Sequence, residues 1–526
     1  MSASGSPGPT PGNVLFITVD QWRGDCLSAL GHPVVRTPAL DRLAAGGTLF
    51  ANHWAQSAPC GPSRACLYTG TYQSTNRVVA NGTPLDDRFT NLAWEVRAGG
   101  LDPVLIGYTD AAPDPRGLAP DDPRLFSYEG VLPGFDPLVD FRSQSLAPWI
   151  DWLVELGYDR PARVADVYAG DLDHPGAAEH GASWAPSIYP AEHRDTAFLT
   201  DRLLAWLDQQ SAGSGAGGAA AGRPWFAHVS YLRPHPPYRA AAPYHDRYRA
   251  EDVATPVRAA SPQDEPSHPL ADWLRSLPPV QVPEEAELRQ LTATYYGMMA
   301  EVDDQVGRVL DWLDRTGQAD DTLVVLTSDH GVQMGDHWLM EKLGWWDESY
   351  HVPLLVRDPR ADPARRGGRV DAFTEHVDLM PTVLEWLGLP VPRQCEGRSL
   401  GGFVATGRSG VEDWRTEAHW QWDFSDPLGG GPEATFGLSS AQCTLDVLRG
   451  ERWKYVHPAG MAPLLFDLAE DPDQLVDRAG DPACAAALAE CAQRLLSWRM
   501  THADPTLTHL KVTRRGLQGT PDPRAG

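Results

Sequence analysis

One short segment carries the most chemistry in this chain. Cys60-Gly-Pro-Ser-Arg64 matches the pattern Cys-x-Pro-x-Arg, in which the cysteine is recognised for conversion to formylglycine. Two apolar segments that resemble buried strands end in metal-ligand side chains: Asp20 follows the first, and Asp329 with His330 follows the second. Such ligands beside a modifiable cysteine at a helix start predict a metal-assisted hydrolase site.

The expected metal ligands are of mixed type. Asp20, Asp329 and His330, with residue 60, offer oxygen and imidazole nitrogen, a set suited to Mg²⁺, Ca²⁺ or Mn²⁺. Gln21 adds an amide oxygen as a weaker fifth ligand. A lone Asp after a strand is more often a helix cap or turn residue. The convergence of three ligand types with a modifiable cysteine favours a metal here.

Positive charge is scarce in the chain as a whole. The net charge is −26, from 44 Lys and Arg against 70 Asp and Glu, which argues against nucleic-acid or acidic-membrane partners. An anionic substrate must therefore meet local cations. Arg64, on the helix face of Cys60, is expected to hold the nucleophile or its oxyanion. Lys342 and His235 are expected to neutralise the transferred group or protonate the leaving oxygen.

Strands and helices alternate through the first three quarters of the chain. This alternation predicts an α/β fold with a mostly parallel central sheet flanked by helices. Ligands of such sheets gather at the carboxyl ends of the strands, where both aspartates lie. The expected strands are Val14–Val19, Pro103–Gly107, Trp225–Tyr231, Thr322–Thr327 and Pro353–Val356. The expected helices are Thr37–Ala45, Asp195–Gln209, Leu288–Thr316 and Asp378–Leu387.

The pattern changes at about residue 401. Short strands and a final helix predict a smaller α+β C-terminal subdomain, so we expect a catalytic domain over 12–400 and a second unit with a polar tail over 401–526. The Ser/Gly/Ala-rich segment Ser211–Gly222 reads as a flexible surface insertion. The short C-terminal elements are Cys443–Arg449, Arg452–Val456, Leu464–Leu468 and the helix Ala483–Arg499.

Cysteine use and hydropathy bear on location. The 7 cysteines are too few and too scattered for a disulfide scaffold. The first residues lack the apolar core of a signal peptide, and no apolar run approaches the ~18–20 residues of a membrane helix. We therefore expect a cytoplasmic protein with no membrane or nucleic-acid partner.

Motifs along nearly the whole chain resemble the sulfatase family, within the alkaline-phosphatase-like enzymes. Several of them are similar to the phosphonate monoester hydrolase and phosphodiesterase branch of that family. The segments that carry the resemblance are Arg77–Asp86, Ile106–Thr109, Leu232–Pro237, Gly335–Gly344, Phe373–Pro381, His419–Phe424 and Phe466–Pro472.

The resemblance implies an alkaline-phosphatase-like fold and hydrolysis of a small anionic sulfate, phosphate or phosphonate ester. It also implies one divalent metal, a formylglycine at Cys60 made by a formylglycine-generating enzyme, and a homo-oligomer. Asn81 and Tyr108 match family positions that bind substrate oxygens. Two positions depart from the family: Gln21 stands where many sulfatases have Asp, and Asp110 stands where the branch usually has Thr.

The expected chemistry explains why an aldehyde is needed. A formylglycine hydrates to a geminal diol, and one hydroxyl attacks sulfur or phosphorus in line. The second hydroxyl then lets the intermediate collapse to the aldehyde, which expels the anion without attack of water on the sulfur or phosphorus. A serine lacks this second step.

Three functions remain open on sequence grounds. The first is a formylglycine hydrolase that prefers phosphonate or phosphate esters slightly over sulfate esters. The second is an arylsulfatase-type enzyme for small sulfated metabolites, and the third is a non-catalytic sulfatase-like binding protein. The complete residue set disfavours the third. His337 and His351 are ambiguous and stay outside the expected catalytic set.

Overall fold

The computed structural model describes residues 12–142, 145–212, 223–407 and 410–520. Most of the predicted insertion Ser211–Gly222, and the first eleven residues, lie outside the described residues. A central eight-stranded sheet has the order β5-β4-β6-β1-β7-β8-β2-β9. Its strands are β1 Asn13–Val19, β2 Thr48–Phe50, β4 Pro103–Gly107, β5 Asp136–Asp140, β6 Phe226–Tyr231, β7 Thr322–Ser328, β8 Leu354–Arg357 and β9 Gly368–Val370.

Parallel pairing dominates this sheet, as predicted. Strand β1 lies between β6 and β7 and runs parallel to both, with Ile17 opposite Val229 on one side and Leu326 on the other. Strand β8 is antiparallel to its neighbours β7 and β2. The sequence pattern did not identify β2, β5 and β9. Strands β2 and β9 have only 3 residues each, and β5 is a largely exposed edge strand without an apolar run.

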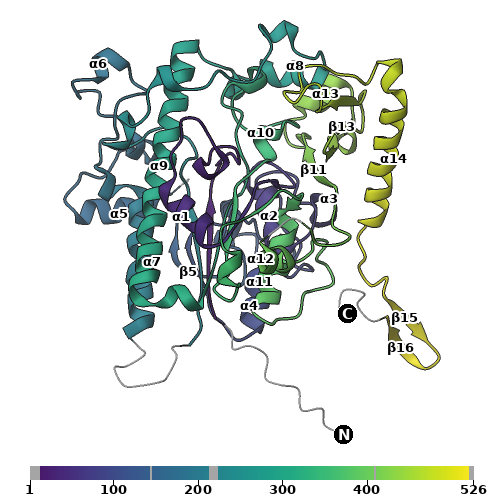
Figure 1. Cartoon of the computed structure of the whole chain (residues 1–526), viewed down its shortest axis with the longest axis horizontal. Helices are drawn as coiled ribbons and strands as arrows, with labels where there is room; N and C mark the ends of the chain where they lie inside the picture. Colours follow the sequence, from purple (N-terminus) through teal and green to yellow (C-terminus); the bar gives the residue numbers. More distant parts are fainter. Residues whose placement is uncertain (1–11, 143–144, 213–222, 408–409, 521–526) are drawn as a thin grey trace.

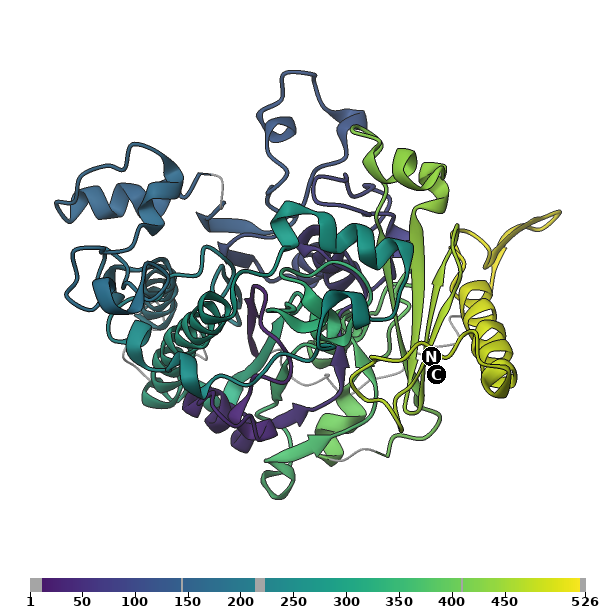
Figure 2. The ribbon, with the colours of Figure 1, turned by 90° about the horizontal axis from the view of Figure 1, so that it is seen from above.

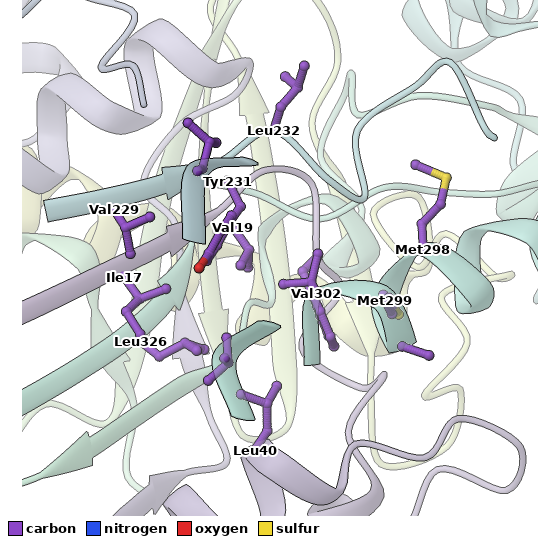
Figure 3. Packing of buried hydrophobic residues seen from close by; sticks show 14 of the residues in the cluster. Ile17, Val19, Leu40, Val229, Tyr231, Leu232, Met298, Met299, Val302 and Leu326 are labelled. Carbon is purple, nitrogen blue, oxygen red and sulfur yellow. The ribbon is translucent and has the colours of Figure 1, made fainter. Parts of the chain in front are cut away.

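Both faces of the sheet are buried, which explains the continuous apolar runs of its strands. Successive side chains point to opposite faces. In β1, Ile17 and Val19 join the core on one face, whereas Val14 and Phe16 join the core on the other. Figure 3 shows the first core, where Val302 of helix α9 lies near the strand residues.

Helices cover the two faces in separate groups. Helices α1, α7 and α9 contribute to the core that contains Ile17, and α2, α4, α11 and α12 contribute to the opposite core. Figure 1 shows α7 and α9 side by side. The helices of this part are α1 Pro38–Gly46, α2 Cys60–Thr69, α3 Gln73–Asn76, α4 Leu92–Ala98, α5 Ala147–Glu155, α6 Ala177–His180, α7 Asp195–Ala212, α8 Pro269–Ser276, α9 Glu285–Thr316, α10 Asp347–Tyr350, α11 Leu379–Trp386 and α12 Gly401–Thr406.

A second, antiparallel sheet of order β11-β12-β13-β14 follows in the chain, and α14 packs against it. It adjoins the N-terminal part of the fold through the stacked rings of Trp54 and Trp420, whose centroids are 5.2 Å apart. Phe403 of α12 still packs in the core of the large sheet, just past the predicted boundary at 400. The remaining elements are β3 His53–Trp54, β10 Thr374–Glu375, β11 Glu417–Asp423, α13 Gly431–Phe436, β12 Thr444–Gly450, β13 Trp453–Pro458, β14 Leu464–Asp467, α14 Ala485–Thr501, β15 Leu510–Thr513 and β16 Gly516–Gly519.

The last two strands form a hairpin that projects from the outer side of the molecule beyond α14 (Figure 2). Val512 and Leu517 on this hairpin are 83% and 65% exposed. Among the helices of the described residues, none has the length and apolar character needed to cross a bilayer.

Candidate active site

The predicted ligands meet at the carboxyl ends of two neighbouring strands. Val19 at the end of β1 pairs with Ser328 at the end of β7, so the residues that follow, Asp20 and Asp329, emerge side by side. Ligand atoms of Asp20, Cys60, Asp329 and His330 all lie within 4.8 Å of one another. All four residues are buried, so the cluster forms a compact donor set within the protein.

Helix α2 delivers Cys60 to this cluster as its first residue. The Sγ atom of Cys60 lies 3.1 Å from His330 Nε2 and 3.7 Å from Lys342 Nζ. The helix start is fixed by Asn81, whose Oδ1 accepts the Gly61 N–H at 2.9 Å. The hydroxyl of Ser63, one turn along the helix, hydrogen-bonds to the Asp329 carbonyl.

Arg64 lies below the cluster and contacts the carboxylates. Its Nε donates to Asp329 Oδ2 at 2.9 Å, and its Nη2 is 3.5 Å from Asp20 Oδ2. Its Nη1 donates to Ser230 Oγ at 2.9 Å. The guanidinium therefore orients the two carboxylates, and its predicted contact with the nucleophile or oxyanion stays a prediction.

Tyr108 and Asn81 already have protein partners. The Tyr108 hydroxyl donates to Asp20 and accepts from Arg64 Nη2 at 3.1 Å, and its ring stacks under the guanidinium at 4.3 Å. Asn81 is exposed, and with its Oδ1 engaged by Gly61 it has Nδ2 left to donate. Substrate binding by these two residues stays a prediction, with Asn81 better placed for it.

Gln21 belongs to a chain of hydrogen bonds beside the cluster. Its Oε1 accepts from Lys342 Nζ at 2.7 Å, and its Nε2 donates to Tyr238 Oη at 3.1 Å. Its backbone has a φ of 70°, and its carbonyl accepts from the Tyr295 hydroxyl. These contacts fix which way the amide faces. The amide oxygen, predicted to bind metal, contacts Lys342 here, which leaves it one further lone pair.

His235 lies on the segment that follows β6. Its Nδ1 is 2.7 Å from the Pro236 carbonyl, which sets the tautomer that keeps hydrogen on Nδ1 and leaves the Nε2 lone pair open. Burial, followed by the charge of Lys342, lowers the pKa of His235 well below its ordinary value. The imidazole is therefore neutral in the free protein. A bound anion would raise its pKa toward protonation.

Burial and charge shift the ionisation of the whole cluster. Burial, then the charge of Asp329, raises the pKa of Asp20. Burial lowers the pKa of His330 to about 4, which keeps the imidazole in the form that binds metals. Burial alone would lower the pKa of Lys342, but Cys60 and Asp20 raise it, so Lys342 is cationic.

This donor set fits a divalent cation. Two buried carboxylates lie next to each other, and burial together with Asp329 disfavours the charge on Asp20. A cation among oxygen and imidazole donors would relieve that repulsion. Both carboxylates and the neutral imidazole are thus in place to hold the ion.

Sequence reasoning missed several supporting residues. Ser63 lies inside the modification motif and Tyr238 follows His235-Pro-Pro, so their position in the motifs was an available signal. Ser230 lies on β6, before the segment of His235, and Tyr295 lies on α9. Neither belongs to a motif, and only the fold shows that they contact the site.

The chain matches the sequence profile of the Sulfatase family over residues 12–389. Residues 335–501 also match the profile described as N-sulphoglucosamine sulphohydrolase, C-terminal. The chain is 42% identical over 523 residues to the multifunctional alkaline phosphatase superfamily protein PehA of Trinickia caryophylli. The alignment covers 96% of this chain and 98% of that protein.

Two solved structures are similar over nearly the whole chain. The phosphonate monoester hydrolase of Agrobacterium radiobacter superposes with a TM-score of 0.89 at 43% identity, covering 97% of this chain and 100% of that one. The phosphonate monoester hydrolase of Silicibacter pomeroyi gives 0.88 at 37% identity, covering 97% and 99%.

Proposed function

Because the chain belongs to the sulfatase family, and is therefore a hydrolase of ester bonds, we propose that it cleaves phosphonate or phosphate esters with a formylglycine made from Cys60. The observation that carries this proposal is the position of Cys60. Its side chain reaches the two carboxylates and the imidazole from the start of α2. The Sγ atom stands in for a hydroxyl of the hydrated aldehyde.

In this proposal Asp20, Asp329, His330 and residue 60 hold one divalent ion, which would supply Lewis-acid stabilisation of negative charge when bound. Gln21 remains proposed as a weaker fifth ligand through its amide oxygen, and it has a second role. Its amide oxygen holds the Lys342 ammonium at 2.7 Å, close to residue 60. Arg64 keeps the Asp20 and Asp329 carboxylates in position for the ion.

The remaining cations act on the substrate. Lys342 lies 3.7 Å from Cys60 Sγ, within reach of an oxygen on the transferred group. Anion binding would favour protonation of His235, which would then have a proton on Nε2 for the leaving oxygen. Asn81 would donate from Nδ2 to a non-bridging oxygen.

The charge of the site favours a singly charged ester. Asp110 is 8% exposed, and its backbone carbonyl faces Gly61, the residue after the proposed nucleophile. Gln21 supplies no charge, while Asp110 adds a carboxylate. A phosphodiester or phosphonate monoester carries one negative charge, whereas a phosphate monoester carries up to two. An arylsulfatase activity is the second candidate, because a sulfate monoester also carries one charge and the family profile is that of sulfatases.

Peptide mass spectrometry tests the proposal directly. We expect an aldehyde at position 60 in protein produced with a formylglycine-generating enzyme, and turnover of an aryl phosphonate monoester or phosphodiester. Cys60→Ala should abolish turnover and leave the fold intact, because a small side chain at a helix start contributes little to stability. An unmodified thiol in fully active protein would show that the proposed nucleophile is wrong.

We also propose that the chain forms a homo-oligomer through the hairpin of β15 and β16. Val512 and Leu517 expose apolar side chains there. The segment 505–519 contains Lys511, Arg514 and Arg515 and no acidic residue, in a chain whose net charge is −26. A basic, apolar hairpin is complementary to the acidic surface of a second copy.

A further inference from the structure

The segment 232–238, which carries His235, is anchored by a buried ion pair on the side away from the site. It connects β6 to the rest of the fold and carries Tyr238, the partner of Gln21, as well as His235. The segment also contains Arg233, whose buried side chain pairs with Asp195 of α7; the two residues are 0% and 1% exposed.

Arg233 binds both the segment and a helix. Its Nη1 donates to the carbonyls of His235 at 2.5 Å and Pro237 at 3.0 Å. Its Nε donates to Asp195 Oδ2 at 3.0 Å. Three of its hydrogen bonds thus connect the backbone of the catalytic segment to one carboxylate.

The Asp195 carboxylate is itself fixed in position by a helix and by a tyrosine. Asp195 is the first residue of α7, a helix that packs on the sheet. Tyr168 donates its hydroxyl to Asp195 Oδ2 at 2.9 Å, and the Tyr168 ring lies 4.2 Å from the Arg233 guanidinium carbon. Burial would raise the pKa of Asp195, but the charge of Arg233 lowers it, so the pair is ionised.

We propose that the Arg233–Asp195 ion pair, supported by Tyr168, is the device that positions His235 against the substrate. This inference rests on the proposed function, in which His235 acts on the leaving oxygen. Arg233 is a positioning residue: it binds the His235 backbone and acts only through it. No contact joins it to the metal-ligand cluster in the described part of the chain.

The geometry requires an arginine at this position. A guanidinium offers five N–H groups in a planar fork, so it can donate to two carbonyls and a carboxylate at once. A lysine keeps the charge beside Asp195, but all its N–H groups are on one nitrogen, whereas Arg233 uses Nε for the carboxylate and Nη1 for the two carbonyls. Arg233→Lys should therefore loosen the segment while keeping the buried charge paired.

A double-mutant cycle tests the proposal. A misplacement of about 1 Å can slow an enzyme by about 100-fold, so we expect Arg233→Lys to lower kcat by roughly 10- to 100-fold with little change in bound metal. His235→Ala should also lower kcat. The double variant should be no slower than His235→Ala alone, within about twofold, because both changes remove one function.

Arg415→Lys is the matched control. Arg415 is a half-buried arginine that pairs with Asp378 and Glu375, and within the described residues no bond joins it to the His235 segment. It should lower the melting temperature to a similar degree as Arg233→Lys, without changing kcat. If the losses of Arg233→Lys and His235→Ala instead multiply in the double variant, Arg233 has only a structural role and the proposal fails.

Crystal structures of the wild type and Arg233→Lys provide a readout that does not depend on turnover. We expect the His235 imidazole to move relative to Lys342, with Asp20, Asp329 and His330 unmoved. An unmoved imidazole would overturn the positioning role, even if the ester activity were confirmed. Absence of any ester hydrolysis by the wild type would count against the proposed function, and this structural comparison would still decide the role of Arg233.

Discussion

The free-energy cost of burying charge explains the contacts and the ionisation of single residues in this site. Arg64 is 1% exposed and lies against two carboxylates that would otherwise repel each other. Burial would raise the pKa of Asp329, but the interactions with its neighbours His330 and Arg64 lower it. Asp329 thus remains a carboxylate, while the pKa of its neighbour Asp20 is raised. The residues act as one charge-balanced unit, and removal of one member should affect the others.

Asp329→Ala should lose bound metal and turnover together. The change should also lower the free energy of unfolding by about 3–5 kcal/mol, because it leaves the buried Arg64 without its closest partner. Elemental analysis and thermal unfolding of the purified variant measure the two effects. Full metal occupancy in Asp329→Ala would contradict the ligand assignment.

Asp110 should set the preference for substrate charge. Burial raises its pKa to about 7, so its carboxyl becomes charged as the pH rises through neutrality. Repulsion of a doubly charged phosphate monoester should therefore increase from about pH 6 to pH 8. A like-charge contact in a partly dry site costs on the order of 1–4 kcal/mol, so Asp110→Thr should improve monoester turnover, relative to diester turnover, by about tenfold or more at pH 8.

A panel of aryl sulfate, phosphate, phosphodiester and phosphonate substrates measures this effect at both pH values. The ratio between wild type and variant removes the ionisation of the substrate itself from the comparison. A strong preference for the phosphate monoester that is unchanged in Asp110→Thr would contradict it.

At the scale of elements, the segment between β7 and β8 contributes as much to the site as the strands do. It carries His330 and Lys342 and is held in place by His337, whose backbone N–H donates to the Val257 carbonyl at 2.7 Å. The His337 ring stacks on Trp346 at 5.4 Å. A residue that the sequence left ambiguous therefore connects the Lys342 segment to Val257 and Glu265, which precede α9 in the chain.

His337 should make the protein less stable in alkali. Burial alone would lower its pKa, but the hydrogen bond to Glu265 and the nearby carboxylate of Glu348, at 3.7 Å, raise it to about 9. The unfolded-state value is 6.5, so the stabilising charge is fully present below about pH 6.5 and is lost as the pH rises through about 9. The contribution is about 3 kcal/mol.

His337→Asn keeps a residue type that tolerates the φ of 52° at this position. Thermal unfolding between pH 6 and pH 10 should show wild type and variant converging as the pH increases. A stability difference that does not change with pH would mean that His337 is neutral in the folded protein.

At the scale of the whole molecule, the eight-stranded sheet and the antiparallel sheet adjoin each other, whereas the C-terminal hairpin projects beyond both (Figure 2). The cluster of Asp20, Cys60, Asp329 and His330 lies at the end of the large sheet. The antiparallel sheet contacts the same part of the chain through Trp54, six residues before Cys60. Among the described residues, the clusters of buried hydrophobic side chains include no residue of the hairpin.

Charged substitutions on the hairpin should reduce the oligomeric state. Val512→Asp with Leu517→Asp should shift the mass measured by light scattering to that of a smaller species, because burial of carboxylates in an apolar contact is costly. Arg514→Glu with Arg515→Glu should act in the same direction and depend on salt. A wild-type protein with the mass of one chain at micromolar concentration would contradict the proposed interface.

The sequence alone predicted the α/β class, the strands that end in Asp20 and Asp329, and the helix that begins at Cys60. These features are local: a buried strand shows as an apolar run, and the modification motif spans five residues. The family resemblance added the ester hydrolase, and the comparisons confirm that level of function. Very short strands and residues such as Ser230 have no comparable local signal.

Tertiary structure alone decided what each side chain contacts. The pairing of Val19 with Ser328 brings residues more than 300 positions apart to one sheet end, and no local pattern specifies that register. The tertiary structure also places Arg64 in contact with the carboxylates, Gln21 with Lys342, and Arg233 with the His235 carbonyl. Buried polar groups must find partners wherever the fold places them, so these contacts depend on the packing of distant segments.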